Sequence, residues 1–467
     1  MPTIIPHSSG KTVSSIKPTE IPSVKYCSIT HDEAILANYL EYDGEDESDY
    51  DSDYDDLEYL SEGREVYNNG RLYPICIGDK IKFQVGNVLE DRYQISHRLG
   101  RGGYSTVWLA QDLRLNEAVA LKIMVPGDTG DKEYNMQKVV AQDVQDSSHV
   151  LLCKLEDTFL LKGLKGNHRV LVLPLAGPDL GTLGIDRPLL QRMSAAKQAL
   201  QAIESFHKAG LVHSDISLGN LLCGIKTDCK GKFKSLSTTY SELGFPKRIR
   251  YETEWNENGK ISKKLLELVK PLEIPTAWLS DKVYLTDFGT TFRAGTKVEN
   301  KLQGVPSFCA PERFHGQWPS PASDMWSFGL IFFYLYTGKV PFQGIMSHTA
   351  GDILSAMVNR LGPLPEKWKG LYTTGTQPDA SWYDPENNSL PVPDRTLEKI
   401  IHDRQRPGSD EAERLLESKT EKHALAVFKK VFSYLPERRP TASQLLQDPD
   451  FKKLLEMCGV QGGAAGH

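Results

Sequence analysis

A change in hydrophobic periodicity near Arg187 constrains the fold of this chain more than any other feature. Before it, RYQISHRLG and STVWLAQD alternate apolar and polar residues, and AVALKIM is rich in strand-forming residues, which predicts an antiparallel meander. After it, apolar residues recur every three or four positions and predict a helix over 190–206 that ends before Gly210. The recurring residues are Leu190, Met193, Ala196, Leu200, Ile203 and Phe206.

Two further helices are predicted in the second half of the chain. One covers 324–337, is mostly apolar and therefore buried, and is closed by Gly338; the other covers 422–432. Strands that come first and helices that follow predict an α+β fold, with a small β-rich N-terminal lobe and a larger, mainly helical C-terminal lobe.

The two ends of the chain differ in composition from the middle. Eleven acids and no Lys or Arg lie in 41–58, so removing these acids from the net charge of −6 leaves +5 for the rest. Residues 1–60 are too polar to offset their conformational entropy by burial, and we expect a disordered acidic tail. The tail is either a solubilising segment or a mask or dock for a basic surface. Residues 61–92 are predicted to pack on the following domain, and 456–467 to be flexible.

Several classes of protein are disfavoured by composition. The seven cysteines are scattered and lack metal-ligand spacing, which is typical of structural thiols in a reducing compartment. The longest apolar stretch, GLIFFYLYTG, is shorter than the roughly 20 residues of a membrane span. The sequence has no stripe of aromatic and basic residues of the kind that binds nucleic acid. We therefore expect an intracellular protein of the cytoplasm or nucleus, and a monomer.

A glycine-rich turn and a lysine in the next strand form the first candidate site. The stretch LGRGGYSTV places Gly100 and Gly102 in a hairpin turn. The glycines there either supply a positive φ or leave bare backbone that approaches phosphates. Lys122 lies between apolar residues of a predicted strand, and a buried lysine needs a partner. Phosphate oxygens or a helix carboxylate would serve, and Glu133 is the best-spaced acid, with Glu117 and Asp131 as competitors.

Three polar residues further along complete the candidate site. Asp215 and Asn220 lie five residues apart in LVHSDISLGNLL, and Asp287 follows the strand-like run KVYL. Each of these patterns alone is also typical of an ordinary polar turn. Together they supply a candidate base and two oxygen ligands for Mg²⁺, an ion usually held by one or two protein oxygens plus phosphates.

The ordered motifs resemble those of the eukaryotic protein kinases. They are G-x-G-x-x-S-x-V, V-A-L-K, H-x-D-x-x-x-x-N, D-F-G, A-P-E, D-x-W-S-x-G and R-P-T-A. Within that superfamily the chain is similar to the SR-protein kinases, as a divergent, fungal-type member. This similarity is carried by YPICIGDKI, VLVLPLAGPDL, a long insertion over 223–281, and HTAGDILSAMVNRLGPLPEKW. The resemblance covers 93–455 and implies a bilobal kinase fold, with an N-lobe over 93–173 and a C-lobe over 176–455.

The resemblance implies a serine/threonine-protein kinase that uses ATP and Mg²⁺. Asp215 would be the base, Lys122 would bind phosphate and be oriented by Glu133, and Asn220 and Asp287 would hold Mg²⁺. The hinge would lie at Leu173, Pro174 and Leu175. The full set implied to bind ATP is Leu99, Gly100, Arg101, Gly102, Gly103, Tyr104, Ser105, Thr106, Val107, Ala120, Lys122, Glu133, Leu173 and Leu175. A buried Glu312–Arg439 ion pair and an Asp324 that supports the catalytic loop would be structural.

The chain departs from the kinase pattern at three positions. Ser214 stands where many kinases have the Arg that pairs with a phosphorylated activation segment, so we expect activity without such phosphorylation. Ser217 replaces a Lys that contacts the γ-phosphate, which predicts slow catalysis. Cys309 replaces the Arg that this group has before A-P-E. The lysines in PLPEKWKG also leave no visible acidic dock for the basic, Arg/Ser-rich protein substrates that the resemblance implies.

Other functions remain open at this stage. A pseudokinase scaffold would keep the fold and nucleotide binding but signal through protein interactions, and Ser217 favours it. A small-molecule phosphotransferase would lack the A-P-E segment and the D-x-W-S-x-G helix, and a tyrosine kinase would have different residues around the catalytic loop.

The lysines of the insertion predict a solvated loop, a localisation signal or a contact for the acidic tail; they are Lys226, Lys230, Lys232, Lys234 and Lys247.

Overall fold

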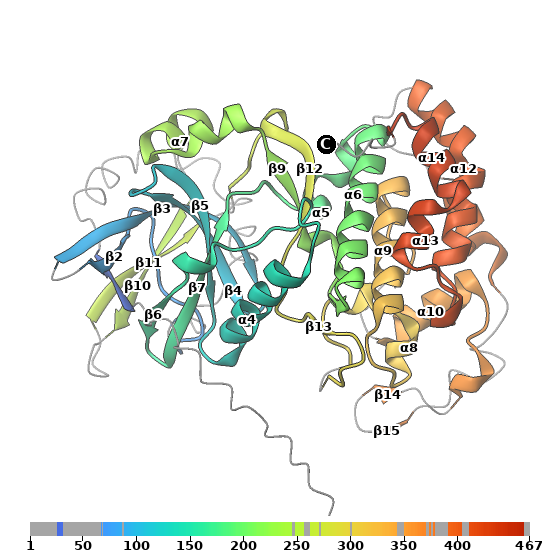
Figure 1. The fold of residues 1–467 in the computed structure, drawn as a ribbon, viewed down its shortest axis with the longest axis horizontal. Helices are drawn as coiled ribbons and strands as arrows, with labels where there is room; N and C mark the ends of the chain where they lie inside the picture. Colours follow the sequence, from blue (N-terminus) through green and yellow to red (C-terminus); the bar gives the residue numbers. More distant parts are fainter. Residues whose placement is uncertain are drawn as a thin grey trace, which may run out of the picture.

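The computed structural model describes residues 26–30, 67, 69–85, 88–244, 248–255, 262–269, 272–298, 301–342, 350–369, 373–374, 377–378, 391–403 and 411–461. Only the backbone is described for 26–30, 84–85, 248–255, 262–269, 373–374, 377–378 and residue 413. The chain forms two lobes, a β-rich N-terminal lobe and a helical C-terminal lobe (Figure 1). The predicted α+β, two-lobed architecture is therefore confirmed.

The N-lobe is built on a closed sheet with the strand order β1-β2-β3-β4-β5-β7-β6. Strands β2 to β5 pair as consecutive antiparallel neighbours, which confirms the predicted meander. Its strands are β1 (Tyr26–Thr30), β2 (Lys80–Val85), β3 (Val88–Gly102), β4 (Ser105–Asp112), β5 (Glu117–Met124), β6 (Phe159–Gly163) and β7 (Gly166–Pro174). Helix α4 (Asp128–Asp143) packs against β7.

The segment before the meander takes part in this sheet. Strand β2 pairs with β3, and Ile75, Ile77 and Ile81 are buried in the same core as Trp108. Strand β1 lies inside the tail that the sequence predicts to be disordered, and it closes the barrel by pairing parallel to β6. A five-residue strand can form in a polar segment because its backbone hydrogen bonds come from the two strands that flank it, β2 and β6. The acidic block 41–58 lies outside the described residues.

The C-lobe surrounds two long helices, α6 (Leu189–Lys208) and α9 (Pro321–Thr337), which pack side by side in Figure 1. The other helices are α5 (Leu180–Leu183), α8 (Pro311–Phe314), α10 (Ala350–Leu361), α11 (Leu397–His402), α12 (Glu411–Val431), α13 (Ala442–Gln447) and α14 (Pro449–Met457). Its strands are β8 (Leu211–Val212), β9 (Leu221–Ile225), β12 (Leu279–Leu285), β13 (Phe292–Arg293), β14 (Thr373–Thr374) and β15 (Gln377–Pro378).

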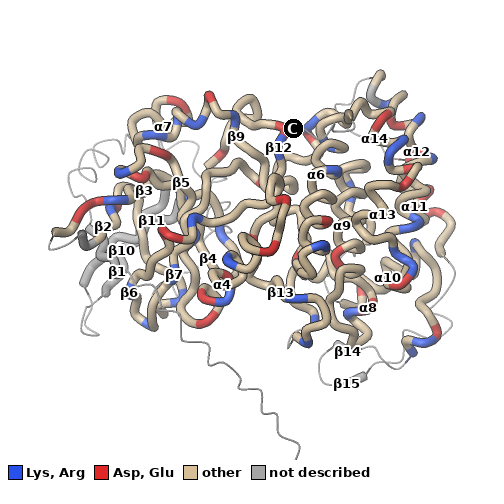
Figure 2. The backbone as a smooth tube through the Cα atoms, viewed as in Figure 1, with Lys and Arg blue, Asp and Glu red and all other residues tan. Residues whose placement is uncertain are grey.

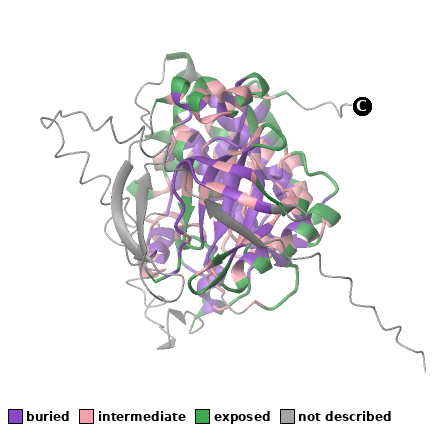
Figure 3. Ribbon diagram, turned by 90° about the vertical axis from the view of Figure 1, so that its left-hand side faces the viewer, coloured by how far each residue is buried: buried purple, intermediate pink, exposed green. Residues whose placement is uncertain are grey.

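The predicted helices are present, with changed boundaries and one reassigned residue. Helix α9 begins three residues before the predicted start because Ser320 and Ser323 form a capping box. Helix α12 begins at Glu411, well before the predicted residue 422, since its first turns are charged and carry little periodic signal. Leu190 does not face the core but is 45% exposed. Buried residues are concentrated at the centre of the molecule in Figure 3, with exposed residues around them.

The described part of the insertion contains secondary structure and contacts the N-lobe, while Lys226, Lys230 and Lys234 are exposed as a solvated segment predicts. It contains helix α7 (Leu236–Leu243) and the hairpin β10 (Arg248–Trp255) and β11 (Ser262–Val269). Tyr240 of α7 is buried in the N-lobe core, and its hydroxyl donates to the carbonyl of Ser96 at 2.8 Å. Lys232 pairs with Glu242 at 2.7 Å. Apolar residues spaced between the lysines are what fold this segment; Lys247 lies outside the described residues.

Candidate active site

The sheet of the N-lobe places an apolar cluster at the boundary between the lobes. Ala120 on β5 lies opposite Leu173 on β7, and Val107 on β4 lies opposite Lys122. Ala120 and Leu173 belong to one small buried cluster, against which Leu99 and Val107 pack. Because antiparallel neighbours present their side chains on a common face, four of the predicted nucleotide-binding residues come together here.

Neither backbone conformation nor packing within the protein requires glycine in the turn between β3 and β4. Gly100, Gly102 and Gly103 do not adopt positive φ, so the alternative that these glycines supply a positive φ to the turn is wrong. A Cβ added at Gly100 or Gly103 would meet nothing within 4 Å. Gly103 is exposed, and its carbonyl accepts a hydrogen bond from Arg71 at 3.0 Å. Bare backbone that opens onto empty space is what close approach by a ligand requires.

Lys122 is held between two carboxylates that come from different parts of the chain. Its ammonium lies 2.8 Å from both oxygens of Glu133 on α4 and 3.0 Å from Oδ1 of Asp287. The side chains of Lys122 and Glu133 are 9% and 1% exposed, whereas that of Asp287 is 43% exposed. The competitors pair elsewhere, Glu117 with Lys154 and Asp131 with Arg169. The cluster thus carries two negative charges and one positive charge, and it opens to solvent at Asp287.

The protonation states in this cluster follow from burial and mutual charge. Burial alone would lower the pKa of Lys122, but attraction to Asp287 and Glu133 outweighs it and raises the pKa. Burial raises the pKa of Glu133 and is only partly opposed by Lys122. For Asp287, attraction to Lys122 overcomes burial and lowers the pKa. At neutral pH the ammonium and the Asp287 carboxylate are therefore charged.

Antiparallel pairing of β9 with β12 places Asn220 next to Asp287. Leu221 lies opposite Leu285, so the residue before β9 and the residues after β12 meet at one end of the hairpin. The amide of Thr286 donates to the carbonyl of Asn220 at 3.0 Å. Asp287 then takes a left-handed φ of 67°. In the part of the chain that the structure describes, only Asn116 and Ser214 share this conformation among residues other than glycine, and such strain concentrates at functional sites.

Both carboxylate oxygens of Asp215 accept hydrogen bonds. Oδ2 accepts from the side-chain amide of Asn220 at 3.1 Å, and Oδ1 accepts from the backbone amide of Val305 at 3.3 Å. The same Asn220 nitrogen also donates to the carbonyl of Asp215 at 2.8 Å. With its nitrogen turned to Asp215, the amide oxygen of Asn220 points the other way. Asp215 is half-buried and has an orientation fixed from two sides.

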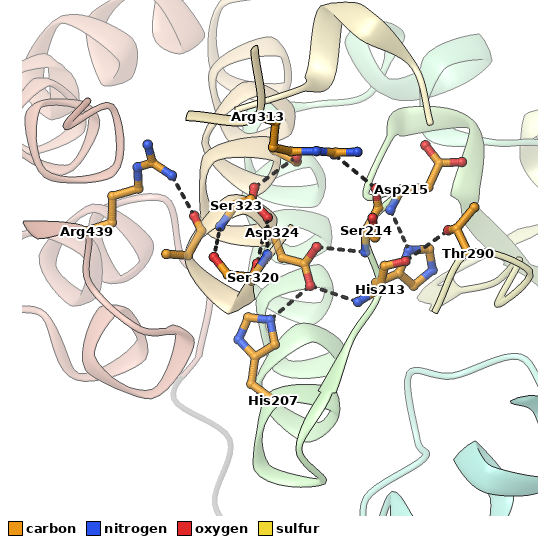
Figure 4. Close-up of polar contacts among 12 residues, drawn as sticks. His207, His213, Ser214, Asp215, Thr290, Arg313, Ser320, Ser323, Asp324 and Arg439 are labelled. Atoms are coloured by element: carbon orange, nitrogen blue, oxygen red, sulfur yellow. Dashed lines mark hydrogen bonds and ion pairs between the residues drawn. The ribbon is translucent and has the colours of Figure 1, made fainter. Parts of the chain in front are cut away.

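Asp324 of α9 supports the backbone that carries Asp215 (Figure 4). Its two oxygens accept from the amides of His213 and Ser214, each at 2.9 Å, and Oδ2 also lies 3.1 Å from Nε2 of His207. Asp324 is 2% exposed. Because the helix is anchored in the C-lobe core, these bonds transmit its rigidity to the loop and its left-handed residue Ser214.

The segment 301–313 is hydrogen-bonded to the same loop at Ser214. Gln303 donates through its side-chain amide to Oγ of Ser214 at 2.8 Å and to the carbonyl of Thr290 at 3.2 Å. Arg313, which is buried, donates to the carbonyls of Lys301 and Ser214 at 2.7 and 3.3 Å. Thr290 in turn donates to the carbonyl of His213 at 3.0 Å. At the position where many kinases have an arginine that pairs with a phosphate, Ser214 therefore accepts one bond at its hydroxyl from the Gln303 amide and one at its carbonyl from the Arg313 guanidinium.

A second buried ion pair lies away from the cleft. Arg439 donates to both oxygens of Glu312 at 2.7 Å, and the two side chains are 0% and 1% exposed. Its guanidinium also donates to the carbonyls of Ser433, Ala322 and Tyr434. Cys309, the residue in place of an arginine, is buried with its thiol 3.9 Å from the carbonyl of Gln303. All of these residues tie segments of the C-lobe together.

The sequence did not predict some residues of the site, and some residues predicted to bind ATP lie outside the apolar cluster. Leu222 on β9 packs against the apolar cluster from the C-lobe side, and its place two residues after Asn220 was an available signal. Gln303 and Gly304 carried no such signal. Leu175 is buried in the C-lobe core and not in the cluster. Arg101 and Tyr104 are exposed at the tip of the turn.

Three observations on the chain as a whole complete the description of its described residues. Within the described ranges, no helix combines the length and the apolar character that a membrane crossing requires. The described cysteines are all buried free thiols. Lysines and arginines are interspersed with aspartates and glutamates along both lobes in Figure 2.

Comparison with known proteins agrees with this geometry. Residues 240–451 match the model of the protein kinase domain family. A serine/threonine-protein kinase SRPK of Physarum polycephalum is 26% identical over 83% of this chain and 90% of its own length. An SRSF protein kinase 3 of Sus scrofa is 28% identical over 42% of this chain and 36% of its own length.

A solved structure extends the agreement to the fold as a whole. The crystal structure of a kinase domain superposes with a TM-score of 0.52 at 18% identity, and covers 82% of this chain and 99% of that one. The 83% of this chain that the Physarum relative covers is more than the helical lobe alone contains. The chain is therefore a protein serine/threonine kinase that resembles the SR-protein kinases.

Proposed function

We propose that this kinase transfers the γ-phosphoryl group of ATP to serine or threonine hydroxyls of proteins. The observation that carries the proposal is the ammonium of Lys122 held 2.8 Å from Glu133 and 3.0 Å from Asp287, across the boundary between the lobes. A lysine whose charge is buried and oriented in this way is positioned to bind phosphate oxygens. On the C-lobe side, Asn220 bonds to Asp215 through its side chain and to Thr286, the residue before Asp287, through its carbonyl.

The nucleotide would bind between the glycine-rich turn and the apolar cluster. Val107 and Ala120 of the N-lobe and Leu222 of the C-lobe would enclose the adenine ring between them, since all three belong to or pack against the same cluster. The backbone after Leu173 would bond the adenine edge. The backbone of Gly100 to Gly103 would cover the phosphates, and a side chain at Gly100 or Gly103 would enter the open space that they need.

The residues present fit a magnesium ion. The Lys122, Glu133 and Asp287 cluster retains one uncompensated negative charge, and its exposed end carries a carboxylate. The amide oxygen of Asn220 would supply the second protein oxygen, a number typical of magnesium sites that also use phosphates. When bound, the ion neutralises charge on the transferred phosphoryl group.

Asp215 would act on the acceptor hydroxyl. As the hydroxyl oxygen bonds to the γ-phosphorus, the bond to the ADP oxygen breaks and the hydroxyl proton passes to a carboxylate oxygen of Asp215. Asn220 and the Val305 amide would hold that carboxylate in line with the hydroxyl. Holding reacting groups in a fixed geometry supplies a large part of the rate, because the entropic cost is met in advance.

We propose in addition that activity does not depend on phosphorylation of the activation segment. Gln303 and Arg313 already fasten this segment to the catalytic loop through neutral groups at Ser214. Treatment of the purified enzyme with a phosphatase, removal of the phosphatase and a transfer assay test this. Turnover should remain within about twofold of the untreated enzyme, and loss of turnover would contradict the proposal.

A nucleotide-binding scaffold is the second candidate, because Ser217 stands in place of the usual lysine and is only 5% exposed. Transfer of radiolabel from γ-labelled ATP to a generic basic protein separates the two functions, with Asp287→Asn as the matched control. Transfer well above that control supports catalysis. ATP binding by the wild type without transfer above the control would establish the scaffold.

The substrate preference can be tested with peptides. We propose basic, Arg/Ser-rich protein substrates, as the resemblance to the SR-protein kinases implies; similarity to proteins named SRPK and SRSF protein kinase 3 supports that resemblance. Lys367 and Lys369 do not form a repelling patch on their own, because they lie 3.1 Å from Glu437 and 3.9 Å from Glu366. A peptide library that compares Arg/Ser repeats with acidic serine peptides tests the preference. A cytoplasmic or nuclear location and a monomeric state stay predictions.

A further inference from the structure

The backbone of the activation segment approaches the proposed base more closely than a side chain would allow. A Cβ built on Gly304 would lie 2.6 Å from Oδ1 of Asp215, 3.1 Å from its Cγ and 3.3 Å from its Cβ. Gly304 also has a left-handed φ of 89°. Only glycine fits this position for both reasons, since other residues lack the conformation and the space.

The same short stretch makes a direct contact with the base. The amide of Val305, the next residue, donates to the Oδ1 atom that Gly304 crowds, while Asn220 holds Oδ2. The carboxylate is thus confined between a side-chain amide on one edge and backbone on the other. Asp215 is otherwise only half-buried, and this contact is what limits its rotation on the side of the activation segment.

Contacts on both sides fix Gly304 in this place. Gln303 bonds to Ser214 and Thr290 through its side chain, and its carbonyl accepts from Nη2 of Arg313 at 2.5 Å. Val305 begins the turn 306–308, in which the amides of Phe308 and Cys309 donate back to Val305 and Pro306. A displacement at Gly304 therefore cannot be absorbed by the flanking residues and is passed to Asp215.

We propose that Gly304 and the Val305 amide are positioning elements for the Asp215 carboxylate, so that the activation segment sets the geometry of the base through backbone atoms alone. This inference rests on the proposed role of Asp215. It gives Gly304 a positioning role in catalysis that the sequence motifs do not indicate.

The chain supplies a matched control for the test. Gly295, which follows β13 and precedes the segment 301–313, has a φ of 86°, but a Cβ added there would meet nothing within 4 Å. Gly295→Ala and Gly304→Ala therefore introduce the same kind of backbone strain, and only the second places an atom against Asp215. We expect Gly304→Ala to lower kcat about 10²-fold, the effect of a misplacement near 1 Å, with the KM for ATP within about threefold. Gly295→Ala should keep kcat within about threefold. Equal losses in the two variants would overturn the proposal.

A double-mutant comparison distinguishes action through Asp215 from a general distortion. In an Asp215→Asn background, Gly304→Ala should reduce the residual kcat by less than about threefold, because residues that act as one unit are not additive. If the 10²-fold loss persists in that background, Gly304 does not act through the base. Absence of transfer by the wild type itself would refute the proposed function separately.

A measurement without turnover tests the contact directly. Deuterium exchange of the Val305 amide, followed by mass spectrometry at single-residue resolution, should accelerate at least about fivefold in Asp215→Ala. Gly304→Ala should give the same acceleration and Gly295→Ala none. Unchanged exchange in Asp215→Ala would show that the amide is not bonded to the carboxylate and would overturn the proposal, whether or not the enzyme turns over.

Discussion

Two buried ion pairs of this kinase have nearly equal nitrogen–oxygen distances but different roles. Arg439 and Glu312 are balanced in charge, sealed from solvent, and surrounded by carbonyls that accept the remaining guanidinium protons. Lys122 and Glu133 are equally close, but a third group, Asp287, leaves excess negative charge at an open end. A closed pair ties segments together, whereas an open cluster with a surplus charge is prepared for a charged ligand.

The largest expected effect comes from removing the surplus charge. Asp287→Asn keeps the size of the side chain but removes the proposed metal ligand, so we expect phosphoryl transfer to fall about 10³-fold or more. Steady-state transfer assays at saturating magnesium check this. If Asp287→Asn retained more than a tenth of wild-type kcat, the open cluster would not be a catalytic site.

Removing one partner of the closed pair should instead cost stability. Arg439→Met leaves the Glu312 carboxylate buried without compensation, so we expect a loss of about 3–5 kcal/mol in the free energy of unfolding. Urea unfolding followed by circular dichroism measures it. The double variant Arg439→Met with Glu312→Leu, which removes both charges, should recover most of the loss, and failure to recover would mean that Arg439 acts mainly through its carbonyl contacts.

Glu133→Gln tests the link between the two halves of the open cluster. The amide can still bond to Lys122 but no longer competes for its charge, so Lys122 is drawn toward Asp287 and is less well oriented for phosphate. We expect kcat/KM for ATP to fall about tenfold, roughly the effect of one ordinary positioning hydrogen bond. Glu133→Ala should lose more, and equal effects of the two variants would show that only the charge matters.

The smallest effect is a difference in the pH dependence of stability. The folded pKa of Asp287 is lowered below 3.8, so its stabilising contribution is present above that pH and is lost as the pH falls. The folded pKa of Glu133 is raised above 4.5, so its contribution is present below that pH and is lost as the pH rises. From pH 3 to 7, the stability difference between wild type and Asp287→Asn should therefore grow, and that between wild type and Glu133→Gln should shrink.

Thermal unfolding midpoints at several pH values measure both differences. The Glu312→Leu, Arg439→Met double variant serves as the control, because it leaves all three groups of the open cluster in place. Parallel trends for Asp287→Asn and Glu133→Gln would contradict the assignment of opposite pKa shifts to the two carboxylates.

The sequence predicted the parts of this protein that depend on local pattern. Alternation and helical periodicity identified the meander and the two central helices, since side-chain direction follows directly from backbone geometry. The types and order of Lys122, Asp215, Asn220 and Asp287 indicated phosphoryl transfer. Burial of a lysine among apolar neighbours required a charged partner, and the structure shows which acid supplies it.

Tertiary structure alone decided how segments distant in sequence meet. Nothing local indicates that β1 closes the barrel, that Tyr240 of the insertion enters the N-lobe core, or that Gly304 lies against Asp215. These contacts join residues separated by tens to hundreds of positions, and their stability comes from packing and shared hydrogen bonds. A residue's own propensity does not encode such partners. The sequence by itself therefore determined the chemistry available to this protein, and the fold determined which atoms are close enough to carry it out.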